Sequence, residues 1–329
     1  MAPTDLSPTP AEAQALSPQA RKYAHQARAA STVRAYRTAW SEFQSFAQGR
    51  AAPAWPASAN LVAEYISALA DRGEKPATIQ VKLAAIAAAH RLAKQPDPTV
   101  DEDVRMIMAG IRRARGTAPQ KKAPALLPDV RQMLAALPDT LAGRRDRALL
   151  LIGFAGAFRR SELVDLDVAD LRLDTKVTIK VKRAKTDQEG KGLTKVIPRL
   201  TDQALCPVAA LQGWLEASGI QSGAVFRPID RWGQLRQRRL TPQSVALIVK
   251  SAAKRAGLEA RQFAGHSLRS GFITEAAQAG VLSRDIMAQT GHQSEAVMRD
   301  YIQDAGLGAL HAAQAAFGEK APTIMNQSH

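Results

Sequence analysis

The chain has 329 residues, of which 45 are Lys or Arg and 30 are Asp or Glu, so it carries a formal net charge of +15. This charge predicts a polyanionic partner, with nucleic acid the first to test. The single cysteine, Cys206, excludes an internal disulfide and a thiolate zinc site and indicates a reducing compartment, so we expect a cytoplasmic, nucleoid-associated protein.

The N-terminal third divides into a leader and a helical domain. Residues 1–20 hold four prolines and lack the basic start of a signal peptide, which predicts a disordered leader. Residues 21–115 carry apolar stripes at spacings of three and four, typical of a small helical bundle. The first stripe follows a candidate N-cap at Ser31, and further helices are expected after Ser58, at Pro76 and around Val104–Ile111. Tyr36, Trp40 and His90 lie on these stripes and are interpreted as core residues.

A connector and a second domain follow. Arg112, Arg113 and Arg115 end the last helix, where they suit either the helix dipole or a phosphate. Residues 116–128 contain three prolines and two lysines without apolar periodicity, which predicts an extended basic connector. The longest apolar run, Ala148–Phe158, is eleven residues, too short to span a bilayer, and predicts a buried helix.

The second domain, residues 129–304, is expected to combine helices with a small sheet. Val177, Ile179 and Val181 alternate with lysines, which predicts a strand with one buried face, and residues 195–197 predict its partner. The hairpin between them carries Lys185 at its base and two glycines at its tip. Helices are expected at Leu205–Leu215, at Thr241–Ala256 and beyond His266. The predicted fold is therefore mainly α with a small antiparallel sheet, in two domains that clamp DNA.

Charged residues recur at helical spacing in this domain. Arg159 and Glu162 are three apart, as are His266 and Arg269, so each pair shares a helix face. Two guanidiniums and an imidazole at one point would suit a phosphate that gains charge in its transition state. A surface salt bridge explains the first pair equally well.

Tyr301 follows His292 by nine residues, and it is the only tyrosine after position 65. On one unbroken helix the two side chains would lie on opposite faces, so a helix end at Gly291 is needed to bring both inward.

With these residues the chain resembles the tyrosine recombinase family, the phage integrase group that includes Cre and the Xer proteins. The sequence GAFRRSEL resembles the family's first arginine motif, with Ala157 and Phe158 in place of the usual Gly-Leu. The resemblance implies a catalytic set of Tyr301 as nucleophile with Arg159, Lys185, His266, Arg269 and His292, and with Glu162 in support. It also implies a 3′-phosphotyrosine intermediate that requires neither ATP, metal nor cofactor.

The resemblance further implies a partner and an assembly. The expected partner is double-stranded DNA with short inverted repeats, bound by a protein that is a monomer in solution and a tetramer on DNA. Leu307, Leu310, Gln314 and Phe317 form a stripe in the C-terminal segment 305–329, which either folds back on its own domain or docks in a neighbouring protomer.

Two other functions stay open at this point. A type IB topoisomerase would use nearly the same residues. A helix-turn-helix regulator would use the stretch from Gly271 to Gln303, with its turn at Gly280, for binding alone.

Overall fold

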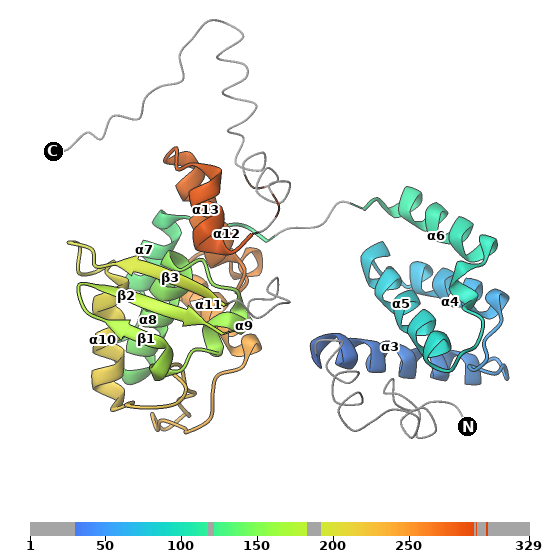
Figure 1. Ribbon diagram of the computed structural model, residues 1–329, viewed down its shortest axis with the longest axis horizontal. Coiled ribbons are helices and arrows are strands. Elements are labelled where there is room, and N and C mark those ends of the chain that lie inside the picture. The colour runs from blue at the N-terminus through green and yellow to red at the C-terminus, as the bar shows by residue number, and fades with distance from the viewer. Residues whose placement is uncertain (1–29, 118–121, 183–191, 293, 295–300, 302–329) are drawn as a thin grey trace, which may run out of the picture. The chain divides into compact units, whose positions relative to one another are not determined.

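The structure is a computed structural model, and it describes residues 30–117, 122–182, 192–292, 294 and 301. The chain divides into two compact units, residues 1–120 and 121–329. The described parts are mainly helical, with one small antiparallel sheet in the second unit, as the sequence predicts (Figure 1). The leader 1–20, Lys185 and the segment 305–329 lie outside the described residues.

Unit 1 consists of four α-helices and a short 3₁₀ turn among its described residues. The helices are α3 (Ala30–Gln48), α4 (Ala59–Asp71), α5 (Pro76–Leu92) and α6 (Glu102–Arg115), and the turn η1 (Pro98–Val100) precedes α6. Ser58 caps α4 by accepting from the Leu61 amide, as expected. The predicted cap Ser31 is wrong, because it already lies inside α3.

The core of unit 1 contains Trp40 and Phe43 of α3, whereas Tyr36, also predicted as a core residue, is only half-buried and lies outside this core. Trp40 and Phe43 are buried against Tyr65 of α4 and the apolar face of α5. His90 is buried as predicted, and its role is structural. Its Nδ1 lies 2.9 Å from the Ile86 carbonyl oxygen, and its Nε2 accepts from the Ala57 amide at 3.0 Å, so the ring is neutral with its proton on Nδ1.

Unit 2 combines seven α-helices with the sheet among its described residues. The helices are α7 (Leu127–Ala135), α8 (Leu141–Ala155), α9 (Arg160–Val164), α10 (Pro207–Ser218), α11 (Pro242–Arg255), α12 (Ser267–Gln278) and α13 (Ser283–Thr290). Two 3₁₀ turns, η2 (Val168–Asp170) and η3 (Ala260–Gln262), precede the sheet and α12. Residues 123–125, within the predicted connector, already hydrogen-bond to this unit, since the Ala123 and Ala125 amides donate to Gln262 and Ser267.

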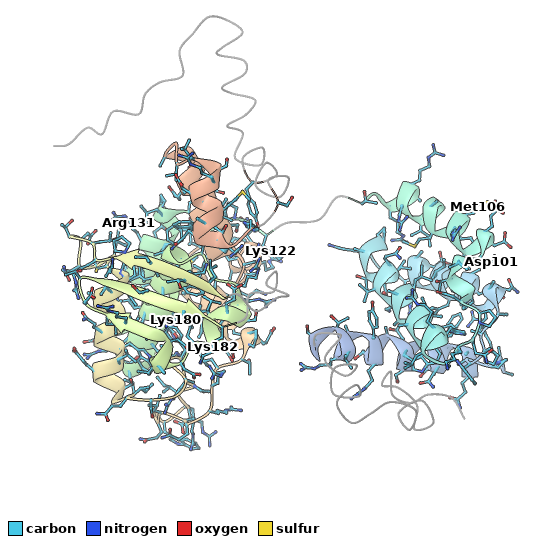
Figure 2. The ribbon with its side chains drawn as sticks, viewed as in Figure 1. Asp101, Met106, Lys122, Arg131, Lys180 and Lys182 are labelled. Atoms are coloured by element: carbon cyan, nitrogen blue, oxygen red, sulfur yellow. The ribbon has the colours of Figure 1, made fainter. Side chains whose placement is uncertain are left out.

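The sheet has the order β1 (Leu171–Leu173), β2 (Lys176–Val181) and β3 (Leu193–Pro198), all antiparallel. The apolar positions of β2 are buried and Lys180 is exposed, so the predicted alternation is confirmed. Figure 2 labels Lys180 on β2 and Lys182 just after it. β1 was not predicted, because three residues are too few to show a period of two.

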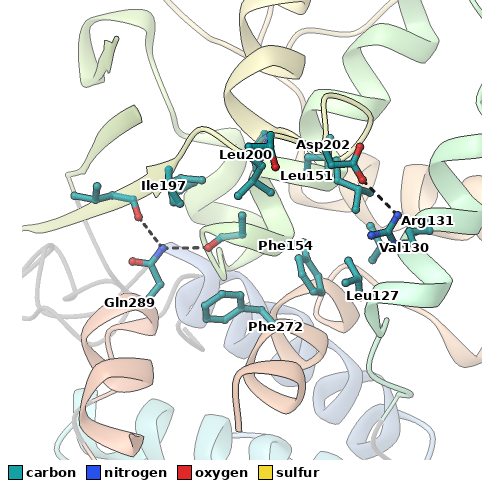
Figure 3. Close-up of a pocket in the computed structure, with 16 residues that line it drawn as sticks. Leu127, Val130, Arg131, Leu151, Phe154, Ile197, Leu200, Asp202, Phe272 and Gln289 are labelled. Carbon is teal, nitrogen blue, oxygen red and sulfur yellow. Dashed lines mark hydrogen bonds and ion pairs between the residues drawn. The ribbon is translucent and has the colours of Figure 1, made fainter. Parts of the chain in front are cut away.

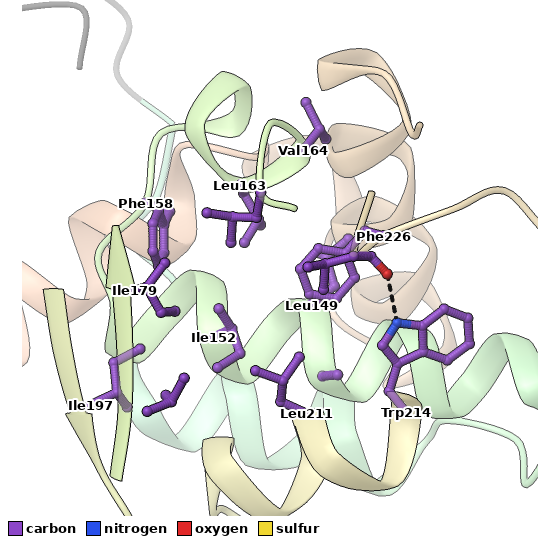
Figure 4. Close-up of a cluster of buried hydrophobic side chains, with 14 of the residues drawn as sticks. Leu149, Ile152, Phe158, Leu163, Val164, Ile179, Ile197, Leu211, Trp214 and Phe226 are labelled. Carbon is purple, nitrogen blue, oxygen red and sulfur yellow. Dashed lines mark hydrogen bonds between the residues drawn. The ribbon is translucent and has the colours of Figure 1, made fainter. Parts of the chain in front are cut away.

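The buried face of the sheet belongs to one apolar cluster with α8 and α10 (Figure 4). Ile152 of α8 lies between the sheet residues and Leu211 of α10, and Leu149 lies beside Phe226. Trp214 is fully buried, and its indole N–H donates to the Val225 carbonyl at 2.9 Å, so its polar atom is satisfied in the core. This cluster supports the helix ends from which the candidate site is built.

Candidate active site

The first arginine of the site follows the end of α8. The predicted helix over Ala148–Phe158 begins and ends too late in the sequence, because α8 begins at Leu141 and ends at Ala155. Phe158 and Ala157 donate their amides to the carbonyls of Gly153 and Phe154, the two bonds of a Schellman motif. Ala157 sits at the left-handed position of that motif with φ of 46°, where glycine is the favoured residue. The tight turn directs the chain away from α8 towards Arg159.

The sequence predicted that Arg159 and Glu162 share a helix. This prediction is wrong, because Arg159 is the N-cap residue that precedes α9. Glu162 still holds it. One carboxylate oxygen accepts from the Arg159 amide at 3.0 Å and the other from Nη1 at 2.6 Å. The Glu162 side chain is only 2% exposed, so this is a largely buried, charge-assisted pair rather than a surface salt bridge.

Arg269 lies on α12 and is fully buried. Its Nη1 donates to the carbonyls of Ala157 at 2.6 Å and Thr290 at 2.8 Å, and so joins the end of α8 to the end of α13. Burial is the main cause that lowers the pKa of Arg269 to about 10, and the charge of Arg159 contributes to this shift, which still leaves the guanidinium charged at neutral pH. Its Nε is buried without a hydrogen-bond partner among the described residues.

His292 follows the C-terminus of α13. Gly291 has φ of 71° and donates its amide to the Met287 carbonyl, so the helix ends where the sequence predicted. The Arg269 Nη2 lies 3.0 Å from His292 Nε2. Because a guanidinium can only donate, Nε2 must accept, and the ring proton lies on Nδ1, 2.9 Å from the Thr290 hydroxyl.

The same surroundings keep His292 neutral. Burial is the main cause that lowers the pKa of His292 to about 4, and the charges of Arg269 and Arg159 add to it. A phosphate between these cations would act in the opposite direction, because its negative charge favours an imidazolium that donates to it.

Tyr301 contacts the other histidine of the site, His266. Its hydroxyl oxygen lies 2.9 Å from His266 Nε2, and its ring centroid lies 6.1 Å from that of His292. The Tyr301 ring also packs beside Ile273 of α12 and Ile286 of α13. Shielding from solvent lowers the pKa of His266, although the residue as a whole is exposed, and Arg269 and Arg159 lower it further.

The structure thus brings together six of the seven predicted site residues. Arg159 and Glu162 come from the turn after α8 and from α9. His266 and Arg269 come from the start of α12, and His292 and Tyr301 follow α13. Lys185 lies outside the described residues. Sequence reasoning missed Lys195 on β3 and Thr290, which contact the same helix ends. Lys195 carried a usable signal, because it alternates in phase with the apolar residues Leu193 and Ile197.

Comparisons with known proteins agree with this geometry. Residues 127–306 match the phage integrase family, and residues 23–96 match the phage integrase N-terminal SAM-like domain. The chain is 40% identical to an integrase/recombinase xerD homolog of Selenomonas ruminantium over 298 residues, covering 89% of this chain and 87% of that protein.

More distant similarities are to other recombinases. The chain is 25% identical to the Cre recombinase of Escherichia phage P1 over 278 residues, covering 78% of this chain and 79% of that protein. It also shares the fold of the XerH site-specific recombinase in its post-cleavage complex with a palindromic difH substrate, at a TM-score of 0.58 and 18% identity, over 80% of this chain and 73% of that chain.

The fold and the family match together define an enzyme that acts on DNA. The chain belongs to the phage integrase family and is a site-specific tyrosine recombinase that cuts and rejoins DNA. This decides against the topoisomerase and the pure regulator, although α12 and α13 do form a helical pair with a turn at Gly280. Within the described parts of the chain, no helix is long and apolar enough to cross a membrane.

Proposed function

We propose that Tyr301 is the nucleophile and that it forms a 3′-phosphotyrosine link to DNA. The observation that carries this proposal is the 2.9 Å contact between its hydroxyl and His266 Nε2. An ordinary tyrosine, with a pKa of about 10, is roughly 0.1% ionised at pH 7, so its phenolate costs about 4 kcal/mol. A neutral imidazole within hydrogen-bond reach supplies the base that removes this proton during attack.

The arginines bind the phosphate that is attacked. Arg159 and Arg269 are held by a carboxylate and by backbone carbonyls, so their positions are set before DNA arrives. Preorganised positive charge stabilises the two negative charges that develop on the non-bridging oxygens. His292 adds a donor once the phosphate has drawn a proton to its Nε2.

The balance of the reaction follows from these roles. The Tyr301 oxygen forms a bond to phosphorus, and the bond from phosphorus to the 5′-oxygen breaks. The phenolic proton passes to His266, and we assign Lys185 as the acid that protonates the leaving oxygen. Attack by another 5′-hydroxyl on the phosphotyrosine reverses these steps, and because the phosphodiester energy is kept in the covalent link, neither ATP nor a metal is required.

The nucleophile is tested by covalent trapping. The protein is incubated with a pool of random nicked duplexes, in which the short 5′-hydroxyl fragment diffuses away after cleavage. We expect an adduct that resists denaturant, carries the DNA 3′ end on Tyr301 by peptide mapping, and enriches one duplex sequence. Tyr301→Phe should bind that recovered duplex as the wild type does but form no adduct, and retained cleavage by this variant would falsify the assignment.

The assembly that we propose is a tetramer on two DNA sites with short inverted repeats, formed from monomers in the cytoplasm. An apolar pocket of about 630 Å³ supports it (Figure 3). Leu127, Phe154 and Phe272 line the pocket, and Gln289 closes one side by donating to the carbonyls of Ala155 and Val196.

We assign to this pocket the stripe Leu307, Leu310, Gln314 and Phe317 of a neighbouring protomer, because its apolar side chains match the lining. Deletion of residues 305–329 should leave monomeric binding to the recovered duplex and remove the tetramer seen by sedimentation. An unchanged tetramer would rule out this docking.

A further inference from the structure

Lys195 occupies a position on β3 that alternation reserves for an apolar side chain. The residue is fully buried, whereas its neighbour Val196 is 44% exposed. Opposite Lys195 in the sheet lies Ile179, which belongs to the apolar cluster of unit 2. A lysine amine is costly to place in such surroundings unless its N–H groups are satisfied.

The amine is satisfied by two backbone carbonyls from different helix ends. Lys195 Nζ donates to the carbonyl of Gly156, after α8, at 2.6 Å, and to that of Gln289, at the end of α13, at 2.7 Å. Helix C-termini leave carbonyls without partners inside the helix and carry partial negative charge, so a cation stabilises both ends.

Lys195 thereby forms a bridge like that of Arg269 between the end of α8 and the end of α13. In each segment the carbonyl that Lys195 binds is one residue before the carbonyl that Arg269 binds. Arg269 joins the carbonyls of Ala157 and Thr290, and Lys195 joins those of Gly156 and Gln289. Two buried basic side chains therefore tie the same two segments together. Arg269 stands on α12, however, whereas Lys195 connects them to the sheet, and the Gln289 side chain reaches β3 only through a longer bond to the Val196 carbonyl at 3.4 Å.

Each segment leads directly to a group of the proposed site. Arg159 follows Gly156 by three residues, and His292 follows Gln289 by three. β3 itself continues the hairpin that carries Lys185 in the sequence. One amine therefore joins the three segments that present the first arginine, the second histidine and the proposed acid.

We propose that Lys195 is a positioning residue for strand cleavage, whose buried amine holds the ends of α8 and α13 against β3 so that Arg159 and His292 keep the spacing that the phosphate requires. This inference rests on the proposed roles of those two residues. The amine does not contact DNA and transfers no proton.

Stability alone does not account for a lysine at this position. The pKa of Lys195 is lowered to about 7, mainly by burial, with Glu162 opposing this shift and Arg269 adding to it. A depressed lysine pKa means that the folded environment disfavours the charge. An apolar side chain of similar length would avoid that cost, so the two hydrogen bonds are the specific property that a lysine adds.

The test compares Lys195→Met with the control Lys176→Met, which alters an exposed lysine of the neighbouring strand. Both are assayed as full-length protein with the nicked duplex recovered by covalent trapping, in single turnover. We expect the rate of adduct formation by Lys195→Met to fall by about 10- to 100-fold, since a misplacement near 1 Å has effects of this size. Duplex affinity should stay within about twofold, because the amine does not contact DNA.

A second variant, Lys195→Gln, keeps N–H donors on a shorter side chain and should recover part of the rate. Circular dichroism and thermal unfolding establish whether each variant is folded. If Lys195→Met is folded and cleaves within about twofold of the wild type, if folded Lys195→Gln is no faster than folded Lys195→Met, or if neither variant folds, Lys195 is not a positioning residue. If the wild type and Lys176→Met also form no adduct, it is the proposed function that fails.

Discussion

The neutral state of His292 predicts a specific dependence of stability on pH. In the structure, His292 Nε2 accepts from Arg269 at 3.0 Å and Nδ1 lies 2.9 Å from the Thr290 hydroxyl. A proton on Nε2 would place two donors face to face and a second positive charge beside the guanidinium. Protonation of His292 therefore opposes folding. The variant His292→Gln keeps an acceptor for Arg269 but cannot be protonated.

The size of the effect follows from the two pKa values. The pKa of His292 is about 4 in the folded protein and 6.5 by reference in the unfolded chain. Between these values the unfolded chain binds more protons, so the free energy of unfolding rises with pH in this window. The contribution is complete above pH 6.5 and is lost as the pH falls through 4. A difference of this size corresponds to about 3 kcal/mol, and partial exposure reduces it to about 2 kcal/mol.

Urea unfolding of both proteins from pH 4 to pH 8 measures this contribution. Other titrating groups, His266 among them, are shared and cancel in the difference between the two proteins. We expect the wild type to lose about 2 kcal/mol more than His292→Gln between pH 6.5 and pH 4. A difference that does not change with pH, or an imidazole that titrates near 6.5 by NMR, would refute the assigned hydrogen bonds.

Two further substitutions test the segment around the first arginine. Ala157→Gly should raise the free energy of unfolding, measured by urea denaturation, by about 0.5–1 kcal/mol. The reason is that relief of the left-handed backbone strain at Ala157 exceeds the added conformational entropy of the unfolded chain. A loss of stability would show that the turn is not strained. Glu162→Gln should cost about 2–3 kcal/mol and slow adduct formation, since it removes a buried charged partner of Arg159. The control Glu216→Gln, on the exposed face of α10, should change neither measurement, and equal effects of the two substitutions would contradict the pairing.

Features that depend on neighbouring residues could be predicted from the sequence. Apolar stripes placed the helices of unit 1, Ser58 marked the start of α4, and Gly291 marked the end of α13. The alternation in β2 also held, because a strand with one buried face selects apolar residues at every second position. Errors occurred where the local signal was weak or ambiguous, as at the end of α8, where apolar residues continue beyond Ala155 into a turn.

The site was predictable as a set of residue types, because each pair of residues falls in a short motif. Its chemistry was not predictable to the same degree. The neutral tautomer of His292 is set by Arg269, and the proposed base for Tyr301 follows from its contact with His266, which lies 35 residues earlier. Spacing along one helix cannot reveal contacts of this kind.

The sequence alone therefore determined the helical architecture, the basic character and the identity of six residues that meet in one site, because periodicity, caps and short motifs are local properties of a chain. Only the tertiary structure decided that Lys195 is buried and that two basic side chains join the ends of α8 and α13. Arg269 reaches a carbonyl 112 residues away and Lys195 one that is 94 residues away. Hydrogen bonds over such separations depend on how the sheet and helices pack, and no local pattern encodes that packing.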